Sequence, residues 1–133
     1  MASKGKILVV DDENSIRDLF QSVFTEADYE VLLAEGAKDA LVILKIHDID
    51  VIFLDLKLFG MNGIELCRQI RKNKPSSMIY AMTGWSALFE IDECREAGFD
   101  DYFEKPMDMD KLLLLVKQAF ERLERWKKHN KPI

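Results

Sequence analysis

The chain of 133 residues is poor in cysteine, proline and glycine and has no long apolar run. Its two cysteines, Cys67 and Cys94, cannot form a disulfide framework, and no second thiol or histidine stands near either at metal-ligand spacing. We therefore expect buried thiols and a reducing compartment. The apolar runs 7–10 and 112–116 are too short for a signal peptide or a membrane span. These absences predict one cytoplasmic globular domain.

Positive charge is scarce outside the C-terminal end of the chain. The 19 basic and 24 acidic residues give a formal net charge of −5. Nucleic-acid binders neutralise phosphates with cations, so we expect no direct nucleic acid binding. The basic residues near the end fit a solvated helix end favoured by the helix dipole. They are Arg122, Arg125, Lys127, Lys128 and Lys131.

Short apolar runs alternate with amphipathic segments along the whole chain. After 6–10, for example, apolar residues from Ile16 to Ala27 recur at helical spacing. Five strands alternating with five helices predict a doubly wound α/β fold with a five-stranded parallel sheet. The expected strands are 6–10, 30–34, 51–55, 78–83 and 101–104. The first expected helix begins near Asn14. The other four contain Ala40–Leu44, Ile64–Ile70, Leu88–Cys94 and Leu112–Leu123. At helical spacing, not all four leucines of 112–115 can face the core.

Polar residues gather where the expected strands end. Asp11 and Asp12 follow the first strand, Asp55 ends the third, Thr83 ends the fourth, and Lys105 follows the fifth. In open α/β sheets, the carboxyl ends of the strands form the functional edge. Close carboxylates repel by roughly 4 kcal/mol per pair at an effective dielectric of ~20, so such a cluster raises a pKa or binds a hard cation. Ligands that are all oxygens favour Mg²⁺.

The same five side chains suit phosphoryl transfer better than proton transfer, because none titrates near neutrality. Cations and donors around a carboxylate stabilise the oxygens of a transferring phosphoryl group. Asp55, alone at the end of the central strand, is the best candidate nucleophile, and a carboxylate nucleophile gives an acyl phosphate. Asp11 and Asp12 are better suited to hold the metal.

A family resemblance rests on Asp11-Asp12, Asp55, Thr83-Gly84 and the segment 101–106, together with the loop 55–63. This set resembles the receiver domain of bacterial two-component response regulators, which has a flavodoxin-like fold. The resemblance covers about residues 6–123. We take 1–125 as the receiver domain and 126–133 as a basic tail or the start of a linker.

The resemblance implies a phosphoacceptor and a metal site. Asp55 would accept a phosphoryl group from a histidine kinase or a histidine phosphotransfer protein. Mg²⁺ would be bound by Asp12, Asp55, the main-chain carbonyl of Lys57 and, through a water, Asp11. The domain would assist its own phosphorylation and also its own dephosphorylation, which would be slow.

The resemblance also implies a conformational switch. Lys105 would pair with the phosphoryl oxygens, ahead of a cis peptide bond at Pro106. Thr83 would turn inward toward the phosphoryl group and Tyr102 would follow. The surface of the fourth helix, fifth strand and fifth helix would then signal to a partner, and the fourth and fifth helices are where the family often forms homodimers.

The sequence departs from the family pattern near the site. Leu58-Phe59 replaces a common Met-Pro pair, and Met107 stands where phenylalanine is frequent. Lys57 and Trp85 each lie two positions after a key residue, beside the path of the hydrolytic water in the family. We hypothesise that these two residues restrict water and prolong the phosphoryl state.

Other functions fit the residues less well. A Rossmann-type nucleotide site wants glycines after the first strand, where this chain has three acids. A haloacid-dehalogenase-type phosphatase wants an aspartate at the position of Lys57. An interaction module that keeps the fold without phosphoryl turnover remains as the alternative. Whether the chain is a complete single-domain regulator or part of a longer protein is left open.

Overall fold

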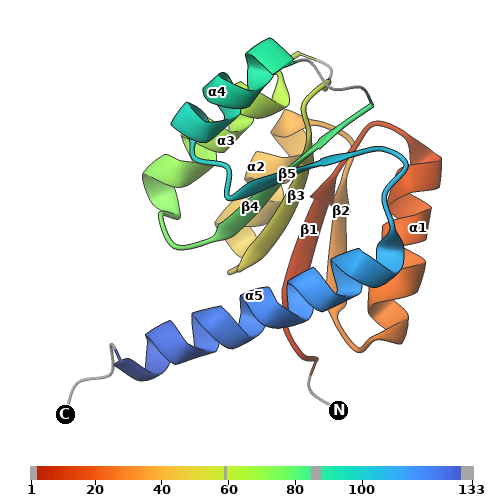
Figure 1. Cartoon of the computed structure of the whole chain (residues 1–133), viewed down its shortest axis with the longest axis vertical. Coiled ribbons are helices and arrows are strands. Elements are labelled where there is room, and N and C mark those ends of the chain that lie inside the picture. The colour runs from red at the N-terminus through yellow and green to blue at the C-terminus, as the bar shows by residue number, and fades with distance from the viewer. Residues whose placement is uncertain (1–2, 59, 85–87, 130–133) are drawn as a thin grey trace.

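The structure is a computed structural model that describes residues 3–58, 60–84 and 88–129. Five strands alternate with five helices, as predicted (Figure 1). The strands are β1 (Lys6–Val10), β2 (Glu30–Ala34), β3 (Val51–Asp55), β4 (Met78–Thr83) and β5 (Asp101–Glu104). The helices are α1 (Asn14–Glu26), α2 (Ala37–Ile46), α3 (Gly63–Asn73), α4 (Leu88–Ala97) and α5 (Met109–His129).

All strand pairs are parallel, and the strand order is β2-β1-β3-β4-β5. The order reverses at β1, because the chain goes from β1 outward to β2 and returns to β3 on the other side. In this register Val10 pairs with Leu54, and Asp55 pairs with Met82. The carboxyl ends of β1, β3 and β4 therefore lie level at one edge of the sheet.

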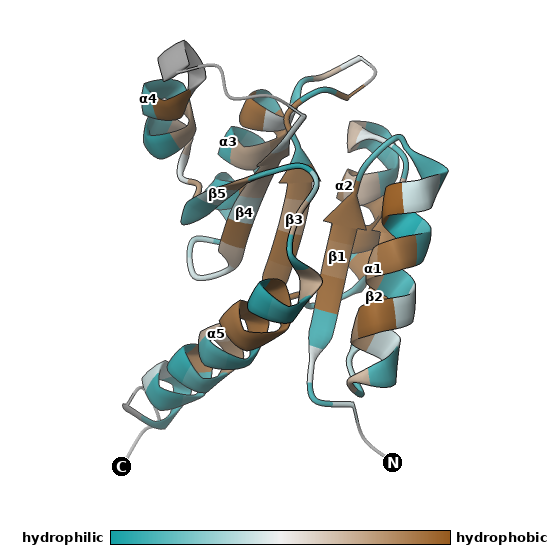
Figure 2. Ribbon diagram, turned by 45° about the vertical axis from the view of Figure 1, so that its right-hand side comes forward, coloured by the Kyte–Doolittle hydropathy of each residue, from teal (hydrophilic) through white to brown (hydrophobic). Residues whose placement is uncertain are grey.

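Helices cover both faces of the sheet (Figure 1). Phe20 and Phe24 of α1 and Val116 of α5 pack on one face, whereas Ala40 of α2 and Cys67 of α3 pack on the other. Because side chains alternate along a strand, the almost fully buried strands β1, β3 and β4 need apolar residues on both sides. Figure 2 shows β1 and β3, in the middle of the sheet, as largely brown strands.

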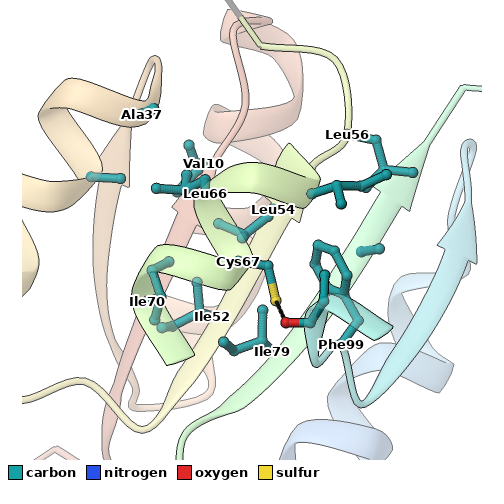
Figure 3. Packing of buried hydrophobic residues seen from close by; sticks show 14 of the residues in the cluster. Val10, Ala37, Ile52, Leu54, Leu56, Leu66, Cys67, Ile70, Ile79 and Phe99 are labelled. Carbon is teal, nitrogen blue, oxygen red and sulfur yellow. Dashed lines mark hydrogen bonds between the residues drawn. The ribbon is translucent and has the colours of Figure 1, made fainter. Parts of the chain in front are cut away.

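Aromatic rings dominate the face under α1 and α5. The ring centroids of Phe20 and Phe53 lie 5.2 Å apart, and those of Phe53 and Tyr80 lie 5.3 Å apart. The opposite face is mainly aliphatic and includes both cysteines (Figure 3). Cys67 Sγ donates to the main-chain oxygen of Ala97 at 3.4 Å, and burial raises the pKa of its thiol to about 12. The prediction that both cysteines are buried is confirmed.

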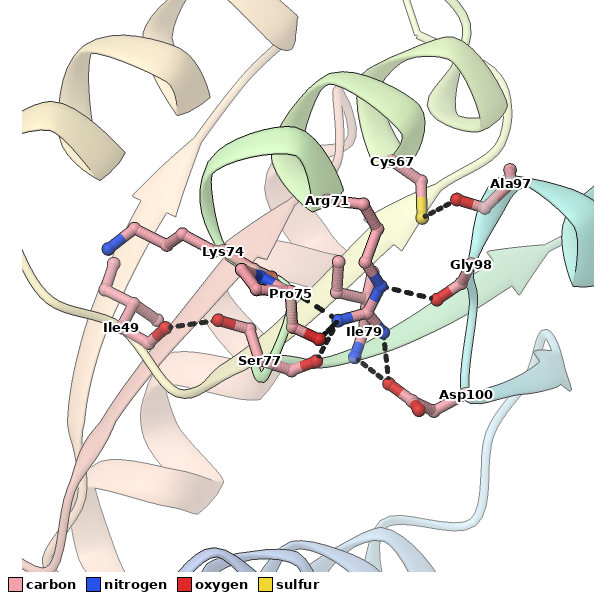
Figure 4. Close-up of polar contacts among 10 residues, drawn as sticks. All are labelled: Ile49, Cys67, Arg71, Lys74, Pro75, Ser77, Ile79, Ala97, Gly98 and Asp100. Atoms are coloured by element: carbon pink, nitrogen blue, oxygen red, sulfur yellow. Dashed lines mark hydrogen bonds and ion pairs between the residues drawn. The ribbon is translucent and has the colours of Figure 1, made fainter. Parts of the chain in front are cut away.

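The amino-terminal edge of the sheet is held by Arg71 of α3 (Figure 4). Its guanidinium donates to Asp100 at 2.6 Å and to the main-chain oxygen of Gly98 at 2.8 Å. It also donates to the main-chain oxygens of Pro75 and Ser77. One side chain thus ties α3 to the connections that lead into β4 and into β5, far from the carboxyl ends of the strands.

The last helix, α5, extends past the sheet (Figure 1). Leu112 is buried but Leu114 is 57% exposed, which confirms that not all four leucines face the core. The predicted boundary between residues 125 and 126 falls inside this helix, which runs to His129. Among the described residues, no helix is both long and apolar enough to cross a membrane.

Candidate functional site

The parallel sheet brings the predicted site residues together at its carboxyl edge. Asp11 follows β1, Asp55 is the last residue of β3, Thr83 is the last residue of β4, and Lys105 follows β5. Three of them are buried: Asp11 is 0%, Thr83 4% and Asp55 5% exposed. Residues spread from position 11 to position 105 of the chain therefore form one polar cluster on an otherwise apolar framework.

The three carboxylates form a candidate cation site. One oxygen from each of Asp11, Asp12 and Asp55 lies within 4.8 Å of the others. Asp12 is exposed, so the cluster is open to solvent on that side. The donor set is oxygen only and suits a hard cation such as Mg²⁺. Asp11 Oδ2 is buried and accepts no hydrogen bond of good geometry, so it has capacity left for a metal-bound water. The residues present therefore fit Mg²⁺.

Lys105 neutralises part of this cluster. Its Nζ lies 2.7 Å from Asp11 Oδ2 and donates to Asp55 Oδ2 at 3.2 Å, and its side chain is 12% exposed. Burial by itself lowers the pKa of the Lys105 ammonium, but Asp11 and Asp55 outweigh burial and raise it. The ammonium is therefore a fixed positive charge beside Asp55. The peptide bond between Lys105 and Pro106 is cis.

Asp55 is held on both oxygens. The main-chain N–H of Lys57 donates to Oδ1 at 3.0 Å, while Lys105 binds Oδ2. Burial raises the pKa of the Asp55 carboxyl. The hydrogen bond from Lys57 opposes burial, Asp11 adds to it, Lys105 opposes it, and the net direction is upward. The surroundings therefore disfavour the ionised form of Asp55. An added positive charge nearby reduces this cost.

The backbone around Asp55 is also tightly packed. The main-chain N–H of Gly63 donates to the carbonyl of Leu56 at 3.0 Å, so α3 begins directly against the end of β3. A Cβ on Gly63 would lie 2.2 Å from the main-chain oxygen of Asp55. Only glycine allows this approach of the helix start to the site.

The remaining predicted residues lie around the cluster. The main-chain N–H of Lys105 donates to the main-chain oxygen of Thr83 at 2.7 Å, which ties the fourth and fifth strand ends together. Tyr102 is partly buried, and its hydroxyl donates to Glu104 at 3.1 Å. Lys57 is exposed. Phe59 and Trp85 lie outside the described residues.

Arg17 also contacts the site, although it was not predicted from the sequence. It is a buried side chain, 7% exposed, which donates to the main-chain oxygen of Asp11 at 2.6 Å. A signal was present, because Arg17 stands three residues before Phe20 and seven before Phe24, on the buried stripe of α1. An arginine on an apolar stripe has to find polar partners, and here they lie in the turn that carries Asp11.

This arrangement places a held carboxylate beside an ammonium and two further acids that suit a cation, with a buried threonine at the end of the neighbouring strand. Such a site can bind a divalent cation and stabilise an anionic group that arrives at Asp55. It has no imidazole or thiol among the described residues that would make it a proton shuttle.

Comparison with known proteins agrees with this chemistry. The family model of the response regulator receiver domain matches residues 7–117. The sporulation initiation phosphotransferase F of Bacillus subtilis is 34% identical over 113 residues, which cover 85% of this chain and 91% of that protein. The alkaline phosphatase synthesis transcriptional regulatory protein PhoP of Bacillus subtilis is 36% identical over 119 residues, covering 90% of this chain and 50% of the relative. The chain thus spans about half the length of that transcriptional regulator.

Solved structures show the same architecture. A CheY-like response regulator receiver domain protein from Methanospirillum hungatei superposes with a TM-score of 0.87 at 29% identity, covering 91% of this chain and 97% of that one. The receiver domain of the Francisella response regulator 1452 gives a TM-score of 0.82 at 27% identity, with 90% and 98% covered.

Proposed function

Because this chain belongs to the response regulator receiver domain family, we propose that Asp55 is its phosphoacceptor and that Mg²⁺ assists the transfer. Receiver domains of response regulators act in phosphorelay signalling and are phosphorylated by histidine kinases or phosphotransfer proteins. The observation that carries the proposal is the position of Asp55. Its carboxylate is held beside Lys105 and within 4.8 Å of two further acids.

The proposed reaction uses these groups as follows. An oxygen of Asp55 attacks the phosphorus of a phosphohistidine, the P–O bond forms, and the P–N bond breaks with its electron pair going to the histidine. Asp12, Asp55, the main-chain carbonyl of Lys57 and, through a water, Asp11 would hold Mg²⁺, which would supply positive charge for the phosphoryl oxygens. Lys105 stays beside Asp55 and pairs with a phosphoryl oxygen.

The other residues would report the transfer. The Thr83 hydroxyl would turn toward a phosphoryl oxygen, and Tyr102 would follow it. This motion would change the surface of α4, β5 and α5, which we propose as the surface that a partner reads. The exposed Leu114 lies on α5 of this surface. Dimerisation through α4 and α5 and a cytoplasmic location belong to the same proposal.

The test is phosphorylation by a small donor. The protein is incubated with Mg²⁺ and acetyl phosphate or phosphoramidate, and intact mass is followed over time. We expect one added phosphoryl group in the wild type and none in Asp55→Asn or without Mg²⁺. The decay of the adduct gives its lifetime, which Lys57→Ala should shorten if Lys57 restricts water. Failure of the wild type to form an adduct, or to bind the mimic beryllofluoride, would favour a pure interaction module instead.

A further inference from the structure

Arg17 is the one basic side chain in the buried class among the described residues. A buried cation is costly unless it is hydrogen-bonded and paired. Arginine meets this need by contacting several acceptors at once through its planar fork. Where Arg17 finds its acceptors therefore indicates what it holds in place.

Arg17 binds both ends of the turn between β1 and α1. Its Nη1 donates to the main-chain oxygen of Asp11 at 2.6 Å, and its Nη2 donates to the side-chain oxygen of Asn14. Nη2 also lies 3.6 Å from Glu35, but that carboxylate is 75% exposed, so the ion pair contributes little. The strong contacts of Arg17 thus enclose Asp12 and Glu13.

The turn lacks the usual support of a helix cap. Glu13 stands at the N-cap of α1 and makes no side-chain capping hydrogen bond. The side chain of Asp11 accepts from the main-chain N–H of Glu13 at 2.9 Å. With Arg17 on its main-chain oxygen and Lys105 beside Oδ2, Asp11 has a polar neighbour at every oxygen. Asp12, the exposed acid, lies in the chain between Asp11 and Asn14, the two residues that Arg17 contacts.

Arg17 and Lys105 act differently on the acidic cluster. Lys105 pairs with the carboxylates of Asp11 and Asp55 and therefore competes with a cation for them. The hydrogen bonds of Arg17 go to a main-chain oxygen and an amide, so a cation can bind without displacing it. Mg²⁺ demands near-ideal ligand geometry, and a shift of the turn lowers its affinity directly.

We propose that Arg17 is a positioning residue that holds the turn of Asp11 and Asp12 in the shape that binds Mg²⁺. This inference rests on the proposed function, since it concerns the same metal site. Partners that orient metal ligands typically change metal affinity by 10–100-fold when they are removed.

The experiment measures Mg²⁺ binding without a phosphodonor, by calorimetric titration of the wild type, Arg17→Gln and Arg17→Lys. We expect Arg17→Gln to raise the dissociation constant for Mg²⁺ at least ~10-fold. Arg17→Lys, which can keep the single bond to the Asp11 carbonyl, should recover part of the loss.

The chain offers a matched control in Arg71→Gln. Arg71 is also a mostly buried arginine that donates to main-chain oxygens, but at the opposite edge of the sheet. Arg71→Gln should lower the free energy of unfolding, measured with urea, as Arg17→Gln does. Its dissociation constant for Mg²⁺ should stay within about twofold of the wild-type value. Asn14→Ala, which removes one partner of Arg17 and leaves Asp11 and Asp12 intact, decides the matter if Arg17→Gln does not fold. It should weaken Mg²⁺ binding too.

The outcomes separate the two claims. A folded Arg17→Gln, or failing that Asn14→Ala, that binds Mg²⁺ as tightly as Arg71→Gln would overturn the role of Arg17 alone. A wild type that binds no Mg²⁺ at all would overturn the proposed metal site and this inference with it.

Discussion

At the scale of single residues, the site holds more negative charge than its surroundings favour. Asp55 is buried, lies next to Asp11, and has one ammonium between them. A raised pKa means that the folded surroundings disfavour the ionised form of the Asp55 carboxyl group relative to water. The free protein therefore carries an electrostatic cost in this cluster, which we expect a bound cation to reduce.

We predict that Asp55→Asn stabilises the metal-free protein. The pKa of Asp55 is raised from 3.8 in the folded chain, so the unfolded chain releases its proton first as pH rises. The free energy of unfolding of the wild type should then fall as pH rises through the interval above 3.8. Asp55→Asn should lack this part of the fall, as measured by urea unfolding with EDTA between about pH 4 and 7.

Asp18→Asn is the control, because Asp18 is an exposed carboxylate on α1. It should keep the wild-type pH dependence. If Asp55→Asn were less stable than the wild type at neutral pH, the bond to Lys105 would outweigh burial and repulsion at this site.

The sequence was informative about which residues meet and less so about how they are held. Asp11, Asp55, Thr83 and Lys105 could be placed together because each ends or follows a strand of a parallel sheet. The bridge from Lys105 to two carboxylates depends on side-chain direction, which spacing does not specify. Their roles in phosphoryl transfer stay predictions until the assay is done.

At the scale of elements, the start of α3 constrains the phosphoacceptor strand. Gly63 begins α3 where a Cβ would lie 2.9 Å from the Cα of Leu56 and closer still to Asp55. We predict that Gly63→Ala costs about 2–3 kcal/mol of unfolding free energy, because backbone atoms cannot yield as a flexible side chain does. Urea unfolding measures the loss, and intact mass should show slower phosphorylation.

Gly84→Ala is a matched control after the neighbouring strand. A Cβ there meets nothing within 4 Å. Its stability should stay within about 0.5 kcal/mol of the wild type. Equal losses in both variants would mean that the close approach of α3 to β3 is not what makes Gly63 necessary.

The positions of helices and strands could be predicted where the spacing of apolar residues was regular. The change from a continuous apolar run to helical spacing located β1 and α1 at the observed residues. Arg17 was missed because a helical pattern is read from apolar residues, and a charge on the stripe counts against burial. The extension of α5 to His129 agrees with the interpretation of the basic residues near the end as a solvated helix end, although the last turns are exposed and carry no apolar stripe.

At the scale of the whole molecule, metal binding and unfolding are linked. A ligand that binds only the folded state stabilises all of it, by ~2.7 kcal/mol at 100 times its dissociation constant. We predict that Mg²⁺ at 100 times its dissociation constant raises the free energy of unfolding by ~2.7 kcal/mol. EDTA should reverse this gain. The measurement is urea unfolding at matched ionic strength.

Asp12→Ala tests whether this gain belongs to the acidic cluster. Asp12 is exposed, so its removal should leave the fold intact and abolish the response to Mg²⁺. A response as large as that of the wild type would assign the gain to general ionic effects rather than to this site.

The parallel strand order has a consequence for synthesis on the ribosome. Every strand pair is joined through a crossover, and β5, which precedes Lys105, is the last strand and lies at one edge. A nascent chain can therefore pair β1, β3 and β4 and expose Asp55 before Lys105 has left the exit tunnel. Until that last strand docks, the acids face one another without their ammonium. We therefore expect the acidic cluster to gain its ammonium late in synthesis, after most of the sheet has been translated.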